Sequence, residues 1–226
     1  MSRAVVLVSG GLDSAVTLAI AKEAGHDCIA VSFDYGQRHR NELDCAKVVV
    51  QALGVTEHHV LQIDASALGG SALTGGGAVP HDRTVTEIGV GIPDTYVPAR
   101  NLVFLSMALA VAETAGARHL YIGANAVDFS GYPDCRVEFL RSFEQTANLA
   151  TKSGVEGAPC TVHAPLLDMT KAQIIQRGLD LGMDFGTTSS CYDPSAAGVP
   201  CGTCDSCLLR SAGFQAVGVD DPRSGA

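Results

Sequence analysis

Residues Ser9–Ser14, SGGLDS, combine two glycines, two serines and an aspartate between the apolar run Ala4–Val8 and a helical pattern that starts at Leu12. Glycine lets backbone N–H groups approach an anion closely, and the first turn of a helix offers free N–H donors and the positive end of its dipole. The serine hydroxyls add further donors. No Gly-Lys-Ser/Thr is present, so the stretch differs from the usual P-loop. We expect it to hold a phosphate.

Asp13 is the unexpected member of this loop, because a carboxylate repels phosphate. Its presence makes sense if it holds Mg²⁺ or caps the turn. The simpler alternative is a glycine-rich turn between a strand and a helix, with Asp13 as a cap and no ligand. SGGxDS directly after a first strand resembles the PP-loop of the ATP pyrophosphatase superfamily, whose members transfer AMP from ATP and release pyrophosphate.

Four cysteines near the end of the chain, Cys191, Cys201, Cys204 and Cys207, have the spacing C-x9-C-x2-C-x2-C. Close pairs of this kind let two sulfurs reach one ion, and the longer loop supplies the remaining ligand. Four thiolates suit tetrahedral, structural Zn²⁺, and an iron–sulfur cluster is the alternative. We predict a four-cysteine zinc site that orders a segment with little core of its own.

Three polar stretches border expected strands or helices: Phe33–Glu42, Val97–Asn101 and Gly123–Arg136. In open α/β sheets the ligand lies beyond the carboxyl ends of the strands, so these stretches should share one edge with the SGGLDS loop. The candidates for a common pocket are Asp34, Arg38, His39, Arg100, Asn125, Asp128, Tyr132, Asp134 and Arg136. Any one of them alone is equally well explained as a solvated loop charge or a local cap. Cys135 has no adjacent histidine, so we do not expect a thiol nucleophile.

Strand and helix patterns alternate along the chain, which implies a parallel sheet with right-handed crossovers and helices on both faces. The expected strands are Ala4–Val8, Cys28–Gly36, His58–Asp64, His119–Asn125 and Thr161–Leu167. The expected helices are Leu12–Glu23, Asn41–Leu53, Asn101–Ala115, Val137–Ser153 and Thr170–Gly182, the last with a capping box formed by Thr170 and Gln173. The fold class is therefore a Rossmann-like α/β sheet, similar to the adenine nucleotide alpha hydrolases.

The chain divides into three expected parts. Residues 1–185 form the α/β domain, residues 186–221 a zinc-binding segment and residues 222–226 a frayed tail. Within the first part, Ala65–Pro93 is rich in glycine and has no clear amphipathic period. A loop of this length in a compact domain is either functional or mobile.

Composition sets limits on function. The 226 residues are 46% hydrophobic and 17% charged, with a net charge of −9, so we expect a compact globule and no non-specific nucleic-acid binding. No apolar stretch reaches the ~18 residues that span a membrane, and no signal peptide is evident. We therefore expect a soluble, cytoplasmic protein, and in that reducing compartment the eight cysteines should be metal ligands or buried thiols rather than disulfides.

Six segments, taken in order, resemble the 7-cyano-7-deazaguanine synthase family: SGGLDS, SFDYGQRH, VPARN, GANAVDFSGYPDCR, VEGAPCTVHAPLLDMTK and SCYDP…PCGTCDSCLLR. The resemblance runs from about Arg3 to about Asp221 and is weakest in Ala65–Pro93. It implies an ATP-dependent ligase. The carboxylate of 7-carboxy-7-deazaguanine is adenylated, and ammonia displaces AMP to give the amide. The amide oxygen is adenylated in turn, and loss of AMP leaves the nitrile.

The resemblance also implies roles for particular residues. It places ATP on Val8, Ser9, Gly10, Gly11, Leu12, Asp13 and Ser14, with Mg²⁺ on Asp13. It places the base, or the rest of the nucleotide, on Phe33, Asp34, Tyr35, Arg100, Asn101, Asn125, Asp128 and Tyr132. Aromatic rings would stack on the deazapurine, and a carboxylate would pair with its guanidine-like edge. Free ammonia is the expected nitrogen source, because the chain has no room for a glutamine-hydrolysing domain.

Two other functions stay open from the sequence. The first is another PP-loop enzyme, such as a tRNA-thiolating enzyme, although the acidic balance disfavours an RNA-binding surface. The second is a zinc-ribbon module that binds nucleic acid or protein, which leaves the SGGLDS loop without a purpose. A dinucleotide-binding protein is not expected, since no G-x-G-x-x-G follows the first strand. The oligomeric state is open, with a homodimer as one candidate; no membrane partner is expected.

Overall fold

The computed structural model describes residues 2–37, 41–64, 70–74, 77–88, 91–125 and 131–224. A parallel sheet of five strands in the order β3-β2-β1-β4-β5 forms its centre. The strands are β1 (Arg3–Leu7), β2 (Asp27–Asp34), β3 (Glu57–Gln62), β4 (His119–Tyr121) and β5 (Thr161–His163). β1 is central, and its residues Ala4, Val5 and Val6 are completely buried, as a continuous apolar run predicts. The predicted fold class is confirmed.

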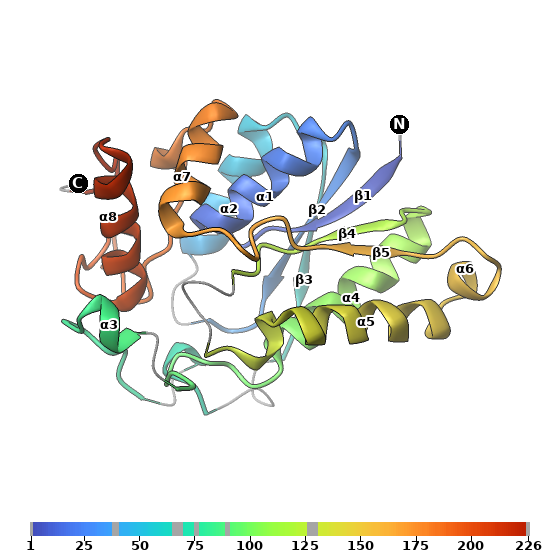
Figure 1. Cartoon of the computed structure of the whole chain (residues 1–226), viewed down its shortest axis with the longest axis horizontal. Helices are drawn as coiled ribbons and strands as arrows, with labels where there is room; N and C mark the ends of the chain where they lie inside the picture. The colour runs from blue at the N-terminus through green and yellow to red at the C-terminus, as the bar shows by residue number, and fades with distance from the viewer. Residues whose placement is uncertain are drawn as a thin grey trace.

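Helices cover both faces of this sheet (Figure 1). On one face Leu18 of α1 and Val49 of α2 pack with β1 and β2. On the other face Leu105 of α4 and Phe143 of α5 do so. The helices are α1 (Leu12–Glu23), α2 (Asn41–Ala52), α3 (Val85–Ile88), α4 (Arg100–Ala115), α5 (Val137–Ala150), α6 (Lys152–Val155), α7 (Lys171–Asp180) and α8 (Asp205–Val217). Packing of apolar side chains on both faces thus holds the helices against the sheet. The positions of the helices and strands in turn set the positions of the loops at the strand ends.

Local sequence signals explain several boundaries. α1 has the predicted bounds, and Thr170 and Gln173 form the predicted capping box at the start of α7. The helix predicted over residues 137–153 is instead divided at Thr151. This residue adopts extended backbone (φ −105°, ψ 149°), and its hydroxyl accepts a hydrogen bond from the N–H of Gly154 at the start of α6. β4 and β5 end at Tyr121 and His163, earlier than predicted, so more of the following residues are free to line a site.

α8 is not predicted from the sequence, because its glycine, serines and cysteine obscure the helical period. Gly213 allows α8 to pack closely on α7: a Cβ atom there would lie 2.7 Å from Cγ of Lys171. After α8, the Asp221 carboxylate accepts two hydrogen bonds from the Arg210 guanidinium, each 2.8 Å long. Arg223 donates to the carbonyl of Gly198 at 2.9 Å. Arg223 and Ser224, in the described part of the predicted tail, thus make hydrogen bonds to Gly198 and Asp221.

The described parts of the glycine-rich 65–93 region contact the cysteine-containing segment. The short helices η2 (Ala72–Thr74) and α3 belong to this region, and α3 lies beside α8 (Figure 1). His81 Nδ1 lies 2.8 Å from Oγ1 of Thr203, and Arg83 Nε donates to Asp205 at 2.9 Å. These contacts therefore join residues 81–83 to residues 203–205, which are far apart in the sequence. Within the described part of the chain, none of the helices combines the length and the apolar character needed to cross a bilayer.

Candidate active site

A cavity of about 250 Å³ lies at the carboxyl ends of the strands, where the sequence predicted a common pocket. The predicted residues that line it are Val8, Ser9, Gly11, Leu12, Asp13, Ser14, Phe33, Tyr35, Arg100, Asn101, Asn125 and Tyr132. Gly10, Asp34, Asp134 and Arg136 are not among the lining residues. Asp128, Arg38 and His39 fall outside the described residues. Lining residues that the sequence analysis missed include Glu42, Lys171, Ser189, Ser190, Tyr192 and Arg210.

The loop between β1 and α1 is held by its own serines. Ser14 Oγ accepts a hydrogen bond from the N–H of Ser9 at 3.1 Å and donates to the carbonyl of Gly11 at 3.0 Å. Gly10 has φ +86°, and a Cβ atom there would lie 2.2 Å from the carbonyl oxygen of Glu42. Gly10 is therefore required for the conformation of the loop and for its close packing on α2, although it does not face the cavity.

Asp13 faces a cation that the sequence analysis did not identify. Lys171 Nζ donates to both carboxylate oxygens of Asp13, at 2.7 and 2.8 Å. Lys171 is the first residue of α7, where a positive charge opposes the helix dipole. A lysine placed against the dipole and next to a capping Thr170 is a signal that could have marked it as functional. The cavity thus holds a cation and an anion beside the helix N-terminus.

Aromatic side chains form another wall of the cavity. The rings of Phe33 and Phe104 stack with centroids 4.0 Å apart and planes 7° from parallel. Arg100 Nη1 donates to the hydroxyl of Tyr35 at 3.3 Å, and burial raises the pKa of that hydroxyl. Tyr132 shares a hydrogen bond of 2.8 Å with Oγ1 of Thr95. A flat, partly polar ring would find stacking surfaces and a guanidinium here.

Glu42, at the start of α2, also lines this cavity. Burial raises the pKa of its carboxyl group to about 7, and the positive charge of Arg100 opposes the shift. The carboxyl group therefore titrates close to neutral pH inside the cavity.

Asn101 and Asn125 line the cavity while their amide groups join secondary-structure elements. Asn101 Nδ2 donates to the carbonyl of Asp134 and to the sulfur of Cys135, both at 3.2 Å. The Asp134 carboxylate accepts from the backbone N–H of Asn101 at 2.9 Å, which supplies α4 with a cap from a distant residue. Asn125 Nδ2 donates to the carbonyl of Met169 at 2.9 Å. Burial raises the pKa of Cys135 to about 12.

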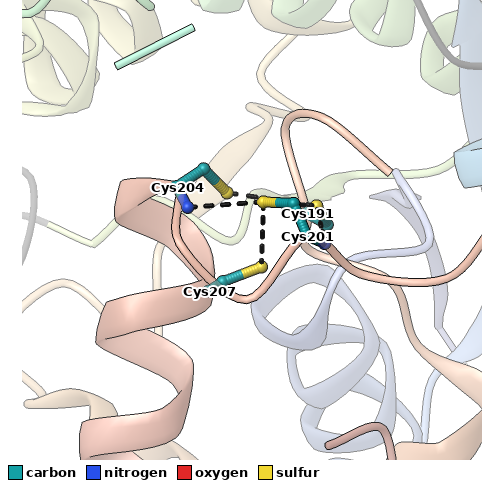
Figure 2. A group of neighbouring side chains, drawn as sticks. All are labelled: Cys191, Cys201, Cys204 and Cys207. Carbon is teal, nitrogen blue, oxygen red and sulfur yellow. Dashed lines mark hydrogen bonds between the residues drawn. The ribbon is translucent and has the colours of Figure 1, made fainter. Parts of the chain in front are cut away.

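Cys191, Cys201, Cys204 and Cys207 gather as predicted, with all four sulfurs within 4.8 Å of one another. Figure 2 shows the sulfurs pointing toward a common centre. Three sulfur–sulfur distances are 3.5, 4.0 and 4.0 Å, close to the spacing of about 3.8 Å that tetrahedral ligation by four thiolates at about 2.3 Å requires. Hydrogen bonds from Cys191 and Cys207 lower the pKa of Cys204. The cluster could hold a metal ion.

Cys191 and Tyr192 line the cavity, so the cysteine cluster lies next to the cavity. Among the other cysteines, Cys28 and Cys45 are buried, as predicted for small apolar residues. A parallel α/β sheet and a glycine–serine loop between its first strand and α1, with Asp13 of α1 contacted by Lys171 of α7, define the class: a PP-loop α/β protein.

The family follows from comparison with known proteins. The model of the family described as "Queuosine biosynthesis protein QueC" matches residues 3–218, and this chain belongs to that family. A 7-cyano-7-deazaguanine synthase of Myxococcus xanthus (strain DK1622) is 59% identical over 98% of this chain and 96% of its own. The corresponding synthase of Desulfatibacillum aliphaticivorans is 57% identical over 97% of this chain and 95% of its own.

Two solved structures are similar to this chain in fold alone. NMN synthetase from Francisella tularensis superimposes with a TM-score of 0.51 at 19% identity, over 97% of this chain and 78% of that chain. A 4-thiouridine synthetase, solved with RNA and bound ATP, gives 0.50 at 20% identity, over 80% of this chain and 41% of that chain.

Proposed function

We propose that this protein is an ATP-dependent ligase that converts 7-carboxy-7-deazaguanine and ammonia to 7-cyano-7-deazaguanine, releasing AMP and pyrophosphate. The observation that carries the proposal is the cavity that joins the SGGLDS loop to a wall of aromatic rings and Arg100. Membership of the QueC family and relatives that carry the synthase name support it.

The loop and α1 form the proposed site for the ATP phosphates. Backbone N–H groups of a glycine-rich turn and of a helix N-terminus bind phosphate oxygens. Asp13 fits Mg²⁺, because its carboxylate faces the cavity, and Mg²⁺ is commonly held by one or two carboxylates together with substrate phosphates. When bound, that ion would neutralise phosphate charge. With nucleotide bound, Lys171 would contact a phosphate oxygen instead of Asp13. Both residues would therefore have a role in the free protein, as an ion pair, and in the nucleotide complex, as ligands of the phosphate and of Mg²⁺.

The aromatic wall forms the proposed site for the base. Phe33, Tyr35 and Tyr132 offer ring surfaces for the deazapurine, and Arg100 offers a guanidinium for its carboxylate. In the reaction, a carboxylate oxygen attacks the α-phosphorus of ATP and pyrophosphate leaves. Ammonia then attacks the acyl carbon and AMP leaves. The amide oxygen attacks a second ATP in the same way, pyrophosphate leaves, and loss of AMP and of both amide N–H protons gives the nitrile. Arg100 would hold the oxygen that is being activated.

The cysteine cluster is the proposed site of one structural Zn²⁺ ion. Its sulfur–sulfur distances of 3.5–4.0 Å favour a single tetrahedral ion. Each thiolate of a [4Fe–4S] cluster binds a different iron, which places the sulfurs farther apart. The eight cysteines, all free, also favour a reducing compartment such as the cytoplasm.

A product assay tests the function. The protein is mixed with Mg²⁺–ATP, ammonium and 7-carboxy-7-deazaguanine. The base is followed by mass spectrometry and the nucleotide by chromatography. We expect the amide and then the nitrile, with AMP rather than ADP. AMP without a change in the base would contradict the substrate, and a folded, metal-loaded sample that consumes no ATP would contradict the adenylation chemistry.

A further inference from the structure

The segment that leads into the cysteine cluster lies directly against the SGGLDS loop. The backbone N–H of Ser189 donates to the carbonyl of Gly10 at 2.9 Å. The hydroxyl of Ser190 accepts from the backbone N–H of Leu12 at 3.2 Å and so supplies the first turn of α1 with a cap that its own N-cap residue, Gly11, lacks. Both serines line the cavity. The loop after β1 is therefore completed by residues near the other end of the chain.

Both serine hydroxyls still have hydrogen atoms to donate. A serine hydroxyl carries one donor and two acceptor positions, and the contact with Leu12 uses only an acceptor position of Ser190. The hydroxyl of Ser189 is buried, the residue being 2% exposed, and finds no hydrogen-bond partner among the described residues. An unpaired buried hydroxyl is costly, so its retention beside a cavity points to a partner that arrives with a ligand.

The surroundings select an anion as that partner. A Cβ atom on Gly11 would lie 3.3 Å from Oγ of Ser9, 3.6 Å from the carbonyl oxygen of Ser189 and 3.8 Å from Oγ of Ser190, so two hydroxyl groups lie beside the glycine at the start of α1. The start of α1 carries the positive end of its helix dipole, and Lys171, which contacts Asp13, supplies a nearby cation. The two serine hydroxyls, the positive end of the α1 dipole and the Lys171 ammonium together favour an anion such as a phosphate at this point.

We propose that Ser189 and Ser190 donate hydrogen bonds to a phosphate group of the bound nucleotide. This inference rests on the proposed function, since it takes ATP as the ligand. It assigns part of the nucleotide site to the segment that carries the first metal ligand, Cys191, so an ordered cysteine cluster holds the phosphate site together. The two serines are binding residues contributed in addition to the SGGLDS loop.

Calorimetric titration of the metal-loaded, full-length protein with Mg²⁺ and α,β-methylene-ATP tests the proposal. Each of the variants S189A and S190A should bind the analogue about tenfold or more weakly than the unaltered protein. S190T keeps a hydroxyl and should restore most of the affinity. S211A, which removes an exposed serine of α8, is the matched control and should bind normally.

Adenosine, titrated by NMR, distinguishes phosphate contact from a merely structural role, because it has no phosphate. The two alanine variants should bind adenosine as the unaltered protein does. Unchanged affinity for the ATP analogue in both variants, or an equal loss for adenosine, would overturn the inference. If the unaltered protein binds neither ligand, the proposed function fails first, and this inference with it. Zinc content and thermal unfolding of each variant show whether the cluster beside Ser190 is intact.

Discussion

Replacing Lys171 with methionine removes the cation that contacts the Asp13 carboxylate at 2.7 and 2.8 Å, and keeps most of the apolar stem. The two side chains are 11% and 25% exposed. The burial of this ion pair is therefore intermediate. Exposed ion pairs contribute up to about 1 kcal/mol, whereas loss of one partner of a buried pair costs about 3–5 kcal/mol. We therefore expect K171M to lower the free energy of unfolding by about 2 kcal/mol, or about 30-fold in the equilibrium constant.

Urea unfolding followed by circular dichroism measures this loss, in a double-mutant cycle with D13N and D13N/K171M. The double variant should be more stable than the sum of the two single losses predicts, by about 1–2 kcal/mol, because D13N removes the charge that K171M leaves without its partner. No nucleotide is present, so the result does not depend on the proposed reaction. Strict additivity of the two substitutions would refute the ion pair as an energetic contact.

Three further outcomes are expected. G10A should destabilise the protein by more than about 2 kcal/mol, because its Cβ would lie 2.2 Å from the Glu42 carbonyl at φ +86°. G25A is the control, with φ +83° and open space around it, and an equal loss there would contradict the packing argument. Burial lowers the pKa of His119 and His163, whose ring nitrogens lie 3.0 Å apart. Below about pH 6.5 the unfolded chain therefore binds more protons than the folded protein, so the free energy of unfolding should fall as the pH is lowered from 6.5. The fall should be less steep in H163Q. Urea unfolding transitions measured between pH 7 and pH 5 test both expectations. Removing the metal by chelation, or the C201S substitution, should lower the melting temperature in calorimetry and release about one zinc ion per chain; an unchanged melting temperature after complete metal loss would exclude a structural site.

Much of the fold was predictable because its signals are local. The apolar run Ala4–Val8 must be buried on both sides, and the helix pattern over Leu12–Glu23 begins directly after the loop glycines. Parallel strands then place their carboxyl ends at one edge, which was enough to bring Arg100, Asn125 and the SGGLDS loop to one cavity. The cysteine cluster was predictable from spacing alone.

The rest depends on contacts between distant parts of the chain. Lys171 and Ser190 belong to the cavity only because α7 and the cysteine segment pack beside α1, and no sequence period encodes that packing. α8 was missed because its helix is stabilised by close packing on α7 at Gly213 rather than by a strong apolar pattern. Asp34, expected in the pocket, lies at the end of β2 and accepts a hydrogen bond from the N–H of Gly36 at 3.5 Å.

The contacts of Ser189 with Gly10 and of Ser190 with Leu12 have a consequence for biosynthesis on the ribosome. The SGGLDS loop is translated well before the two serines that complete it, so a growing chain carries an unfinished site until the later segment has been made. β1 pairs with β4 as well as with β2, so the pairing of β1 is also incomplete until β4 has been synthesised. A ligand that binds the completed loop, such as the nucleotide proposed above, would therefore stabilise only chains in which both segments are present, and a proteolytic cut followed by loss of either fragment would separate the two halves of the site.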